Sequence, residues 1–248
     1  MALNKAKVIT ITSVKGGTGK TTTVLNLAGI LSRKGQKTLV IDLDLYSGSI
    51  AASLNLDKEN DIYNMCEDLM NNRFKNIEDY TKSYNDFIDV IAAPLDPRSV
   101  NKIKTNYIEI ILSRLILKYD FILIDTNHII DGLNLVILDH SDIVLYTITN
   151  DLMDLKNMRT MVSIFKDMNL TNYKIILNEA RLNNTKYSNY DVQNLIGNNI
   201  DYNLPKSFYN KNIENYVYEG KIMTLDKNIY ESKGGKVLEN IIDNIIKE

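Results

Sequence analysis

The residues of this 248-residue chain that are best suited to chemistry form a short glycine-rich segment between two lysines. Residues 15–22 read Lys-Gly-Gly-Thr-Gly-Lys-Thr-Thr and follow a run of β-branched and other apolar residues. Because Gly16, Gly17 and Gly19 have no Cβ atom, consecutive backbone N–H groups can turn inward and form a nest of the size of an anion. A helix that begins near Lys20 would add the positive end of its dipole. The segment therefore predicts a phosphate-binding loop.

The side chains around this loop indicate that the phosphate belongs to a nucleotide such as ATP, bound together with Mg²⁺. The Lys20 ammonium can reach the β- and γ-phosphates, the Thr21 hydroxyl is placed to bind Mg²⁺, and Thr22 can bond a phosphate oxygen, while Thr18 completes the loop. The ordinary P-loop pattern has glycine where this chain has Val14, so the segment is a variant of that pattern. A purely structural turn is the alternative, but two lysines this close would repel each other without an anion between them.

Three aspartates stand at the ends of two apolar runs. Asp42 and Asp44 end the run 39–43 and lie two residues apart, hence on one side of a strand, and Asp125 ends the run 121–124. In an open parallel sheet, ligands bind at the carboxyl ends of the strands, where these side chains would meet. We expect Asp125 to bind Mg²⁺ through water. The alternative is that the first two aspartates only cap a turn or helix after the strand.

The elements that must position these residues are short apolar strands that alternate with longer stretches of helical periodicity. This alternation is typical of repeated βαβ units, and nearly continuous apolar runs are typical of strands covered on both faces. The sequence thus predicts a three-layer α/β/α fold with a mainly parallel central sheet, and one domain over residues 1–248. The expected strands are residues 7–13, 37–43, 87–92, 121–125, 143–149, 173–178 and 200–204.

Two helices can be placed from their ends. Apolar residues recur at helical spacing over 152–165, and Asn150 or Asp151 can cap the first turn. Ser188 stands three residues before an aspartate in the layout of a capping box, and Gly197 supplies the left-handed position that ends this second helix.

Composition excludes several classes of protein. The chain has 29 Lys plus Arg against 31 Asp plus Glu, a net charge of −2, which is not the strongly basic balance of a nucleic-acid-coating protein. A single cysteine, Cys66, excludes an internal disulfide framework, a Cys-based zinc site and a Cys₄ iron–sulfur cluster within one subunit. No apolar run reaches the roughly 18 residues of a membrane span, and no secretory core follows Met1. We expect a cytoplasmic protein.

Residues 15–22 resemble the deviant Walker A motif of the MinD/ParA ATPases. The resemblance implies a P-loop fold and an ATP-dependent homodimer in which Lys15 reaches across the interface to the nucleotide of the partner subunit, so that nucleotide binding and dimerisation are linked. It also implies that Asp44 contacts the attacking water and that Asp42 lies near the magnesium shell. Hydrolysis is expected to be slow without a partner, because no arginine finger is identifiable.

The resemblance includes residues that would contact the nucleotide base, but the chain departs from the family in the loop after Asp125. Asn178 matches an asparagine that hydrogen-bonds adenine, and Pro205 stands where a further base-contacting loop begins. After Asp125 the family commonly has a proline, whereas this chain continues with Thr-Asn-His at 126–128. His128 is a candidate base, although a loop histidine is more often merely solvated.

Outside the loop the chain is similar to the CpaE/TadZ branch of the family. The similar stretches are residues 41–51, 54–56, 131–142 and 151–157. This similarity implies a protein partner in a pilus or secretion assembly, and recruitment to the cell pole or inner membrane face through that partner. Proteins of this branch often carry a receiver-like domain before the ATPase, and we expect no such domain in this chain because the ATPase pattern already begins at Lys7.

Four other functions remain open from the sequence. A ParA-type partition ATPase would bind DNA, for which residues 98–118 are only moderately basic. A MinD-type membrane anchor would need a basic amphipathic helix, whereas most charged residues of the amphipathic segment 237–248 are acidic. We therefore expect this segment to pack against the sheet. A related tyrosine kinase would end in a tyrosine cluster, but the 15 tyrosines are scattered. The non-enzyme alternative is a scaffold that binds nucleotide for dimerisation with little turnover.

Overall fold

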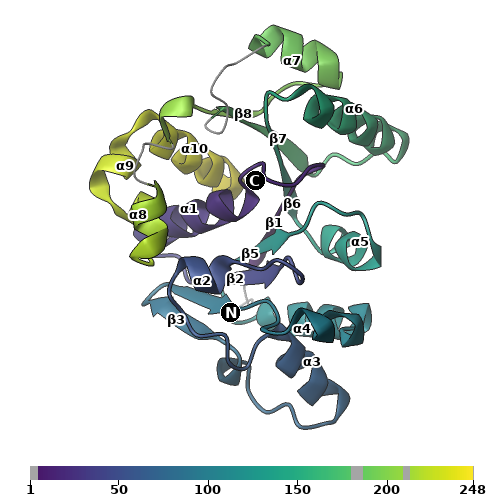
Figure 1. The fold of residues 1–248 in the computed structure, drawn as a ribbon, viewed down its shortest axis with the longest axis vertical. Helices are drawn as coiled ribbons and strands as arrows, with labels where there is room; N and C mark the ends of the chain where they lie inside the picture. The colour runs from purple at the N-terminus through teal and green to yellow at the C-terminus, as the bar shows by residue number, and fades with distance from the viewer. Residues whose placement is uncertain (1–4, 180–186, 209–212, 248) are drawn as a thin grey trace.

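The computed structural model of the protein describes residues 5–179, 187–208 and 213–247, which fold around one sheet with helices on both faces (Figure 1). The strands are β1 (Lys7–Thr12), β2 (Thr38–Leu43), β3 (Lys82–Asn85), β4 (Ile88–Ile91), β5 (Phe121–Thr126), β6 (Ile143–Ile148), β7 (Tyr173–Asn178) and β8 (Tyr202–Leu204). Their order in the sheet is β3-β4-β2-β5-β1-β6-β7-β8, and only β3 and β4 pair antiparallel. The predicted three-layer, mainly parallel fold is confirmed.

Strand β3 is the one described strand that the sequence analysis misses. Its residues Lys-Ser-Tyr-Asn are polar and none of them is fully buried, and the strand lies at the edge of the sheet. A short polar edge strand needs no apolar run, because one side faces water and charge there discourages pairing with other chains. The other strands agree with the prediction to within two residues at each end.

The helices cover both faces of the sheet. The described helices are α1 (Lys20–Arg33), α2 (Ile50–Ser53), α3 (Ile62–Met70), α4 (Thr105–Leu115), α5 (Gly132–Asp139), α6 (Leu152–Asp167), α7 (Asn189–Ile196), α8 (Ile213–Tyr218), α9 (Lys227–Glu231) and α10 (Lys233–Lys247), with 3₁₀ turns η1 (Ile77–Asp79), η2 (Pro97–Lys102), η4 (Lys206–Phe208) and η5 (Met223–Leu225). Asp151 caps α6, a capping box at Ser188 begins α7, and Gly197 ends α7 at φ 68°, as predicted.

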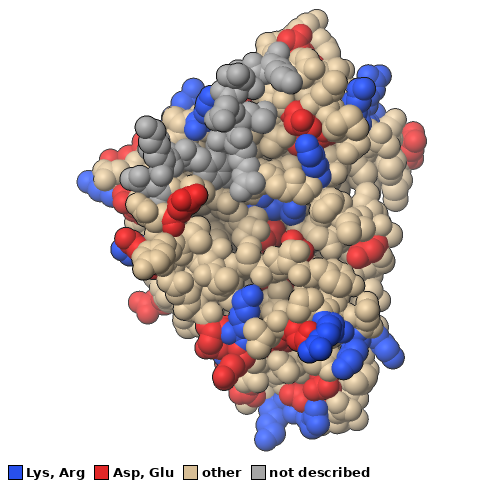
Figure 2. Space-filling model, viewed as in Figure 1, with Lys and Arg blue, Asp and Glu red and all other residues tan. Residues whose placement is uncertain are grey.

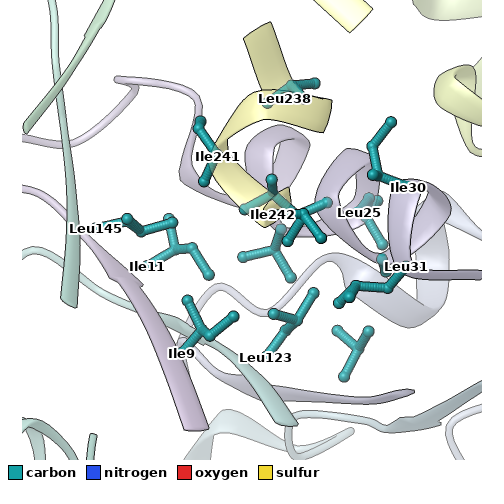
Figure 3. Packing of buried hydrophobic residues seen from close by; sticks show 14 of the residues in the cluster. Ile9, Ile11, Leu25, Ile30, Leu31, Leu123, Leu145, Leu238, Ile241 and Ile242 are labelled. Carbon is teal, nitrogen blue, oxygen red and sulfur yellow. The ribbon is translucent and has the colours of Figure 1, made fainter. Parts of the chain in front are cut away.

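One face of the sheet is packed by α1 and α10 (Figure 3). Leu31 of α1 and Ile242 of α10 are fully buried against strand residues such as Ile9. The last helix is therefore part of the core, as expected for segment 237–248, and the Lys7 ammonium donates to the carbonyl of Ile245 at 2.6 Å. No described helix is both long enough and apolar enough to cross a membrane.

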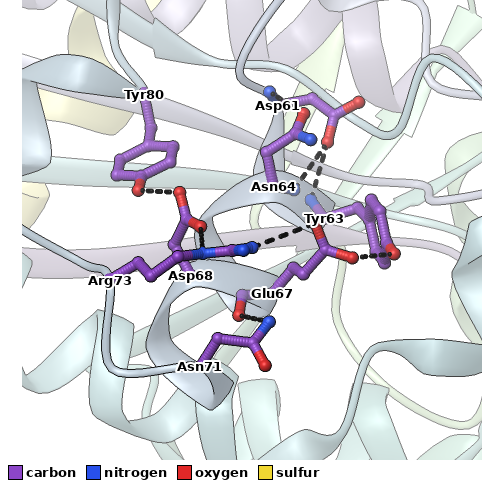
Figure 4. Close-up of polar contacts among 8 residues, drawn as sticks. All are labelled: Asp61, Tyr63, Asn64, Glu67, Asp68, Asn71, Arg73 and Tyr80. Carbon is purple, nitrogen blue, oxygen red and sulfur yellow. Dashed lines mark hydrogen bonds and ion pairs between the residues drawn. The ribbon is translucent and has the colours of Figure 1, made fainter.

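The opposite face is covered by α3, α4 and α5 over β2 and β5, and by α6 and α7 over β6 and β7. Polar contacts fix the start of α3 (Figure 4). The Asp61 carboxylate accepts from the N–H groups of Tyr63 and Asn64, and its second oxygen accepts from the N–H of Leu95 at 2.7 Å. This buried cap ties α3 to the segment that follows β4.

Candidate nucleotide-binding site

The glycine-rich segment forms a loop between β1 and α1. Gly17 and Gly19 have φ values of 78° and 96°, a left-handed conformation that other residues adopt only with strain, and Gly19 stands at the N-terminus of α1. The loop lies at the carboxyl end of the central strands, next to a cavity of about 260 Å³. Predicted site residues that line this cavity are Gly17, Gly19, Lys20, Thr21, Thr22 and Asp44.

Lys20 is held under the loop by a short chain of hydrogen bonds. Its ammonium donates to the Ser13 hydroxyl at 3.1 Å, and that hydroxyl donates to the carbonyl of Lys15 at 2.7 Å. Only 8% of Lys20 is exposed, so the charge is already in place and poorly hydrated. A buried ammonium beside a helix N-terminus attracts an anion strongly.

The carboxylates predicted to hold a metal meet beside Thr21. Asp42 of β2 and Asp125 of β5 are register partners in the sheet, and the Thr21 hydroxyl donates to Asp125 Oδ2 at 2.5 Å. Asp125 is fully buried, yet its Oδ1 has no hydrogen-bond partner among the described residues. A hydroxyl and an orphaned carboxylate oxygen fit Mg²⁺, which takes oxygen ligands and keeps several waters. Among the described residues, no three His, Cys, Asp or Glu form a metal cage on their own, so phosphate and water would complete the shell.

Burial keeps negative charge at this point costly. It raises the pKa of Asp125 to about 8, and the nearby Asp42 charge adds to the shift. Burial also raises the pKa of Asp42 to about 7, although its oxygens accept from the N–H groups of Ile50 at 3.0 Å and Asp44 at 3.3 Å. A divalent cation here would stabilise both ionised carboxylates.

Lys15 does not line the cavity, and it pairs within its own subunit. Its ammonium lies 2.8 Å from Asp151 Oδ1, and the two side chains are 44% and 39% exposed. This hydrogen bond raises the pKa of Lys15 and lowers that of Asp151. Asp151 also accepts from the N–H groups at the start of α6. Sequence reasoning identified Asp151 only as a helix cap, because a contact across 136 residues leaves no local pattern.

The remaining predicted residues lie behind or beside the loop. Thr18 is buried, and its carbonyl accepts from the Asn178 amide at 2.8 Å, so Asn178 contacts the phosphate loop itself. Gly16 is exposed and faces the ring of His128. Pro205 is half-buried at the end of β8, where its carbonyl accepts from the N–H of Phe208, and it does not line the cavity.

An asparagine pair shapes the loop where the family commonly has a proline. Asn127 Oδ1 accepts from the N–H of Ile129 at 2.8 Å and from the Asn134 amide at 2.7 Å. The same Asn134 amide also donates to the carbonyl of Ile129. These bonds close the segment after β5 onto α5 and replace the rigidity that proline would give.

The outer wall of the cavity is made by α8, which the sequence analysis missed. Ile213, Tyr216 and Val217 line the cavity together with the loop residues, and the Tyr216 hydroxyl donates to Asp226 at 2.9 Å. The Asn55 amide after α2 donates to the carbonyl of Tyr218 at 3.0 Å, which joins this wall to the segment that follows Asp44. The six-residue helix is too short for its periodicity to be recognised.

Charges of both signs mix over the visible surface, including the lower part made by α3 and α4 (Figures 1 and 2). Two cations of the moderately basic stretch 98–118 have acidic partners: Arg98 lies 2.8 Å from Asp96, and Lys118 lies 2.5 Å from Glu78. This pairing lowers the positive potential that the stretch offers to nucleic acid.

Known proteins are similar to this chain in sequence. The family model AAA_31, described as an AAA domain, matches residues 6–178. The chain is 30% identical over 160 residues to the septum site-determining protein MinD of Helicobacter pylori, which covers 64% of this chain and 59% of that protein. The alignments span 49% and 59% of the lengths of the first two curated relatives.

Solved structures share the fold. A ParA family ATPase from Chlorobium tepidum superimposes with a TM-score of 0.81 at 20% identity, over 95% of this chain and 98% of that one. MinD from Pyrococcus horikoshii, in complex with Mg-ADP, gives 0.78 at 23% identity, over 97% and 96%. The family match over most of the chain, and a deviant glycine loop set in this fold, confirm the resemblance: the chain belongs to the MinD/ParA family of P-loop ATPases.

Proposed function

We propose that this protein is a Mg-ATP-dependent switch that dimerises with ATP bound and hydrolyses it slowly. The observation that carries the proposal is the buried Asp125 carboxylate: its Oδ2 accepts from the Thr21 hydroxyl, its Oδ1 has no partner among the described residues, and the Lys20 charge acts on it. A magnesium–phosphate group would satisfy all three, because it supplies both an anion and a cation.

In the proposed reaction the chain mainly positions charge. The loop N–H groups and Lys20 bind the phosphates, and Thr21 with Asp125 holds the metal shell, to which Asp42 lies close. Bound Mg²⁺ would neutralise charge on the phosphate oxygens. Asp44 lines the same cavity and would orient the attacking water. Phosphoryl transfer needs little else from a protein than such placement.

Dimerisation is supported by the position of Lys15. Its ammonium is on the surface, outside the cavity of its own subunit, and its Asp151 partner is equally exposed. A cation in this place can pair with the phosphates of a second subunit at the cost of one surface ion pair. Nucleotide binding would then favour the dimer.

The cellular role is proposed from sequence alone. The stretches that resemble CpaE/TadZ favour a positioning switch whose partner belongs to a pilus or secretion assembly. This partner would recruit the protein to the cell pole or inner membrane face. Capture from native lysate with Asp44→Ala and Mg-ATP tests this role. Recovery of a secretion ATPase supports it, whereas recovery of DNA or of a centromere-binding protein supports a ParA-type role instead.

The biochemical proposal is tested by light scattering and phosphate release with and without Mg-ATP. We expect Lys20→Ala to lose nucleotide binding, and Asp44→Ala to bind ATP, dimerise and stop hydrolysing. Asp86→Ala is the matched control, because Asp86 is exposed in the turn between β3 and β4. Dimerisation without turnover in the wild type would indicate a scaffold, and normal ATP affinity in Lys20→Ala would refute the site.

A further inference from the structure

Hydrogen bonds join the phosphate loop to β6 and β7, two strands that are distant from it in sequence. The Thr18 hydroxyl lies 2.8 Å from the Thr147 hydroxyl of β6, and the Thr18 carbonyl accepts from the Asn178 amide of β7 at 2.8 Å. The Thr147 hydroxyl also donates to the carbonyl of Thr12, at the end of β1, at 3.2 Å. Because a hydroxyl has one proton, Thr18 must be the donor in the first bond.

These contacts are buried, so they favour one arrangement of the loop. Thr147 and Asn178 have no exposed surface, and only 1% of Thr18 is exposed. A hydroxyl or amide in such a place costs free energy unless it is paired, so the loop has one favoured arrangement in which all three are satisfied.

The geometry of the peptide bond links this arrangement to the phosphate side of the loop. In a trans peptide the carbonyl of Thr18 and the N–H of Gly19 point in opposite directions. Because Asn178 holds that carbonyl toward β7, the Gly19 N–H is directed away from β7, and Gly19 lines the cavity. Gly19 takes this orientation with a left-handed φ of 96°, which glycine adopts without strain.

We propose that Thr147 and Asn178 are positioning residues that hold the Thr18–Gly19 peptide with its N–H toward the phosphate. This inference rests on the proposed nucleotide site. It adds that Thr147 and Asn178, which lie outside the phosphate loop, position that loop. For Asn178 it differs from the adenine contact implied by the sequence resemblance, because a clamp acts on any phosphate ligand, whereas a base contact acts only on a nucleotide.

Calorimetry with Mg-ADP and with base-free Mg-pyrophosphate separates these roles. Thr147→Val keeps the shape of the side chain but loses the hydroxyl. We expect it to lower the affinities for both ligands by a similar factor of about 3 to 10, which corresponds to the loss of one hydrogen bond. Thr147→Ser should restore both. Asn178→Leu should also lower the affinities for both ligands. If Thr147→Val does not fold, Thr18→Val removes the other hydroxyl of the same pair and tests the same contact.

The matched control is a second buried hydroxyl pair, Thr10 with Ser141 at 2.6 Å, which also joins β1 to the start of β6 but lies outside the cavity. Thr10→Val should leave both affinities unchanged, with thermal midpoints measured for every variant. Unchanged affinities in Thr147→Val, or equal losses in Thr10→Val, would overturn the clamp. Loss of ADP binding alone in Asn178→Leu would make Asn178 a base contact. A wild type that binds neither ligand would instead refute the nucleotide site on which the inference rests.

Discussion

Replacing Asp125 by asparagine should make the metal-free protein more stable at neutral pH. Asp125 is fully buried, with Oδ1 unpartnered among the described residues and Asp42 as its register partner on the next strand. Without Mg²⁺ the Thr21 hydroxyl and the Lys20 charge offset only part of the cost of ionising this carboxylate. Asparagine has the same shape and no charge, so it removes this cost while it also removes the metal ligand.

The sign and size of the effect follow from the pKa. Burial raises the pKa of Asp125 from 3.8 to about 8, so between these values the folded state holds a proton that the unfolded state has lost. The free energy of unfolding then falls as pH rises, by up to about 1.4 kcal/mol per pH unit. From about pH 5 to pH 7 the wild type should lose up to about 3 kcal/mol through this group. Asp42, whose pKa is raised to about 7, adds a slope of the same sign in both proteins.

Urea unfolding in EDTA, without nucleotide, measures this slope across the same pH range. Asp125→Asn should lose less stability with rising pH than the wild type, and the exposed Asp86→Asn should behave as the wild type does. Added Mg-ADP should stabilise the wild type more than Asp125→Asn, because the variant keeps the phosphate loop and loses a metal ligand. Equal pH slopes in the wild type and Asp125→Asn would refute the account of a costly buried carboxylate.

Two further substitutions test packing near Asp44 and the exposed ion pair. In Gly48→Ala the new Cβ would overlap Ala93 Cβ and lie 2.8 Å from Asp42 Oδ2, so urea unfolding should show a loss of about 1–3 kcal/mol together with slower ATP turnover. Gly132→Ala, with nothing within 4 Å of the new Cβ, should show neither effect. Asp151→Asn keeps a good helix cap and frees Lys15, so stability should change by less than about 1 kcal/mol while ATP-dependent dimerisation by light scattering strengthens up to about fivefold. Dimerisation that weakens would contradict this reading of the pair.

Local patterns were enough to predict the parts of the site that are contiguous in sequence. The loop 15–22 and the aspartates at strand ends follow from glycine geometry and from the rule that parallel strands present ligands at their carboxyl ends. The structure brings Asp42 and Asp125 together as register partners, although the sequence does not state the strand order. The strands in the middle of the sheet were equally readable, because both of their faces are covered and every residue of β2, β5 and β6 is buried.

The features that were missed depend on contacts between distant residues. The bond from Asn178 to Thr18 spans 160 residues, and the pair of Lys15 with Asp151 spans 136. A hydroxyl or carboxylate gives no periodic signal that identifies its partner. Strand β3 was missed for a different reason, since its polar residues resemble a turn.

The two lysines of the loop differ in what each must give up to bind phosphate. Lys20 is only 8% exposed and stays beside the Ser13 hydroxyl, so its charge faces the cavity before any ligand arrives. Lys15 is 44% exposed and must first leave Asp151. An exposed pair of this kind is worth at most about 1 kcal/mol, so it delays the second contact without preventing it. Nucleotide should therefore bind to the monomer first, and the dimer should form only when phosphate from a partner offers Lys15 more than Asp151 does.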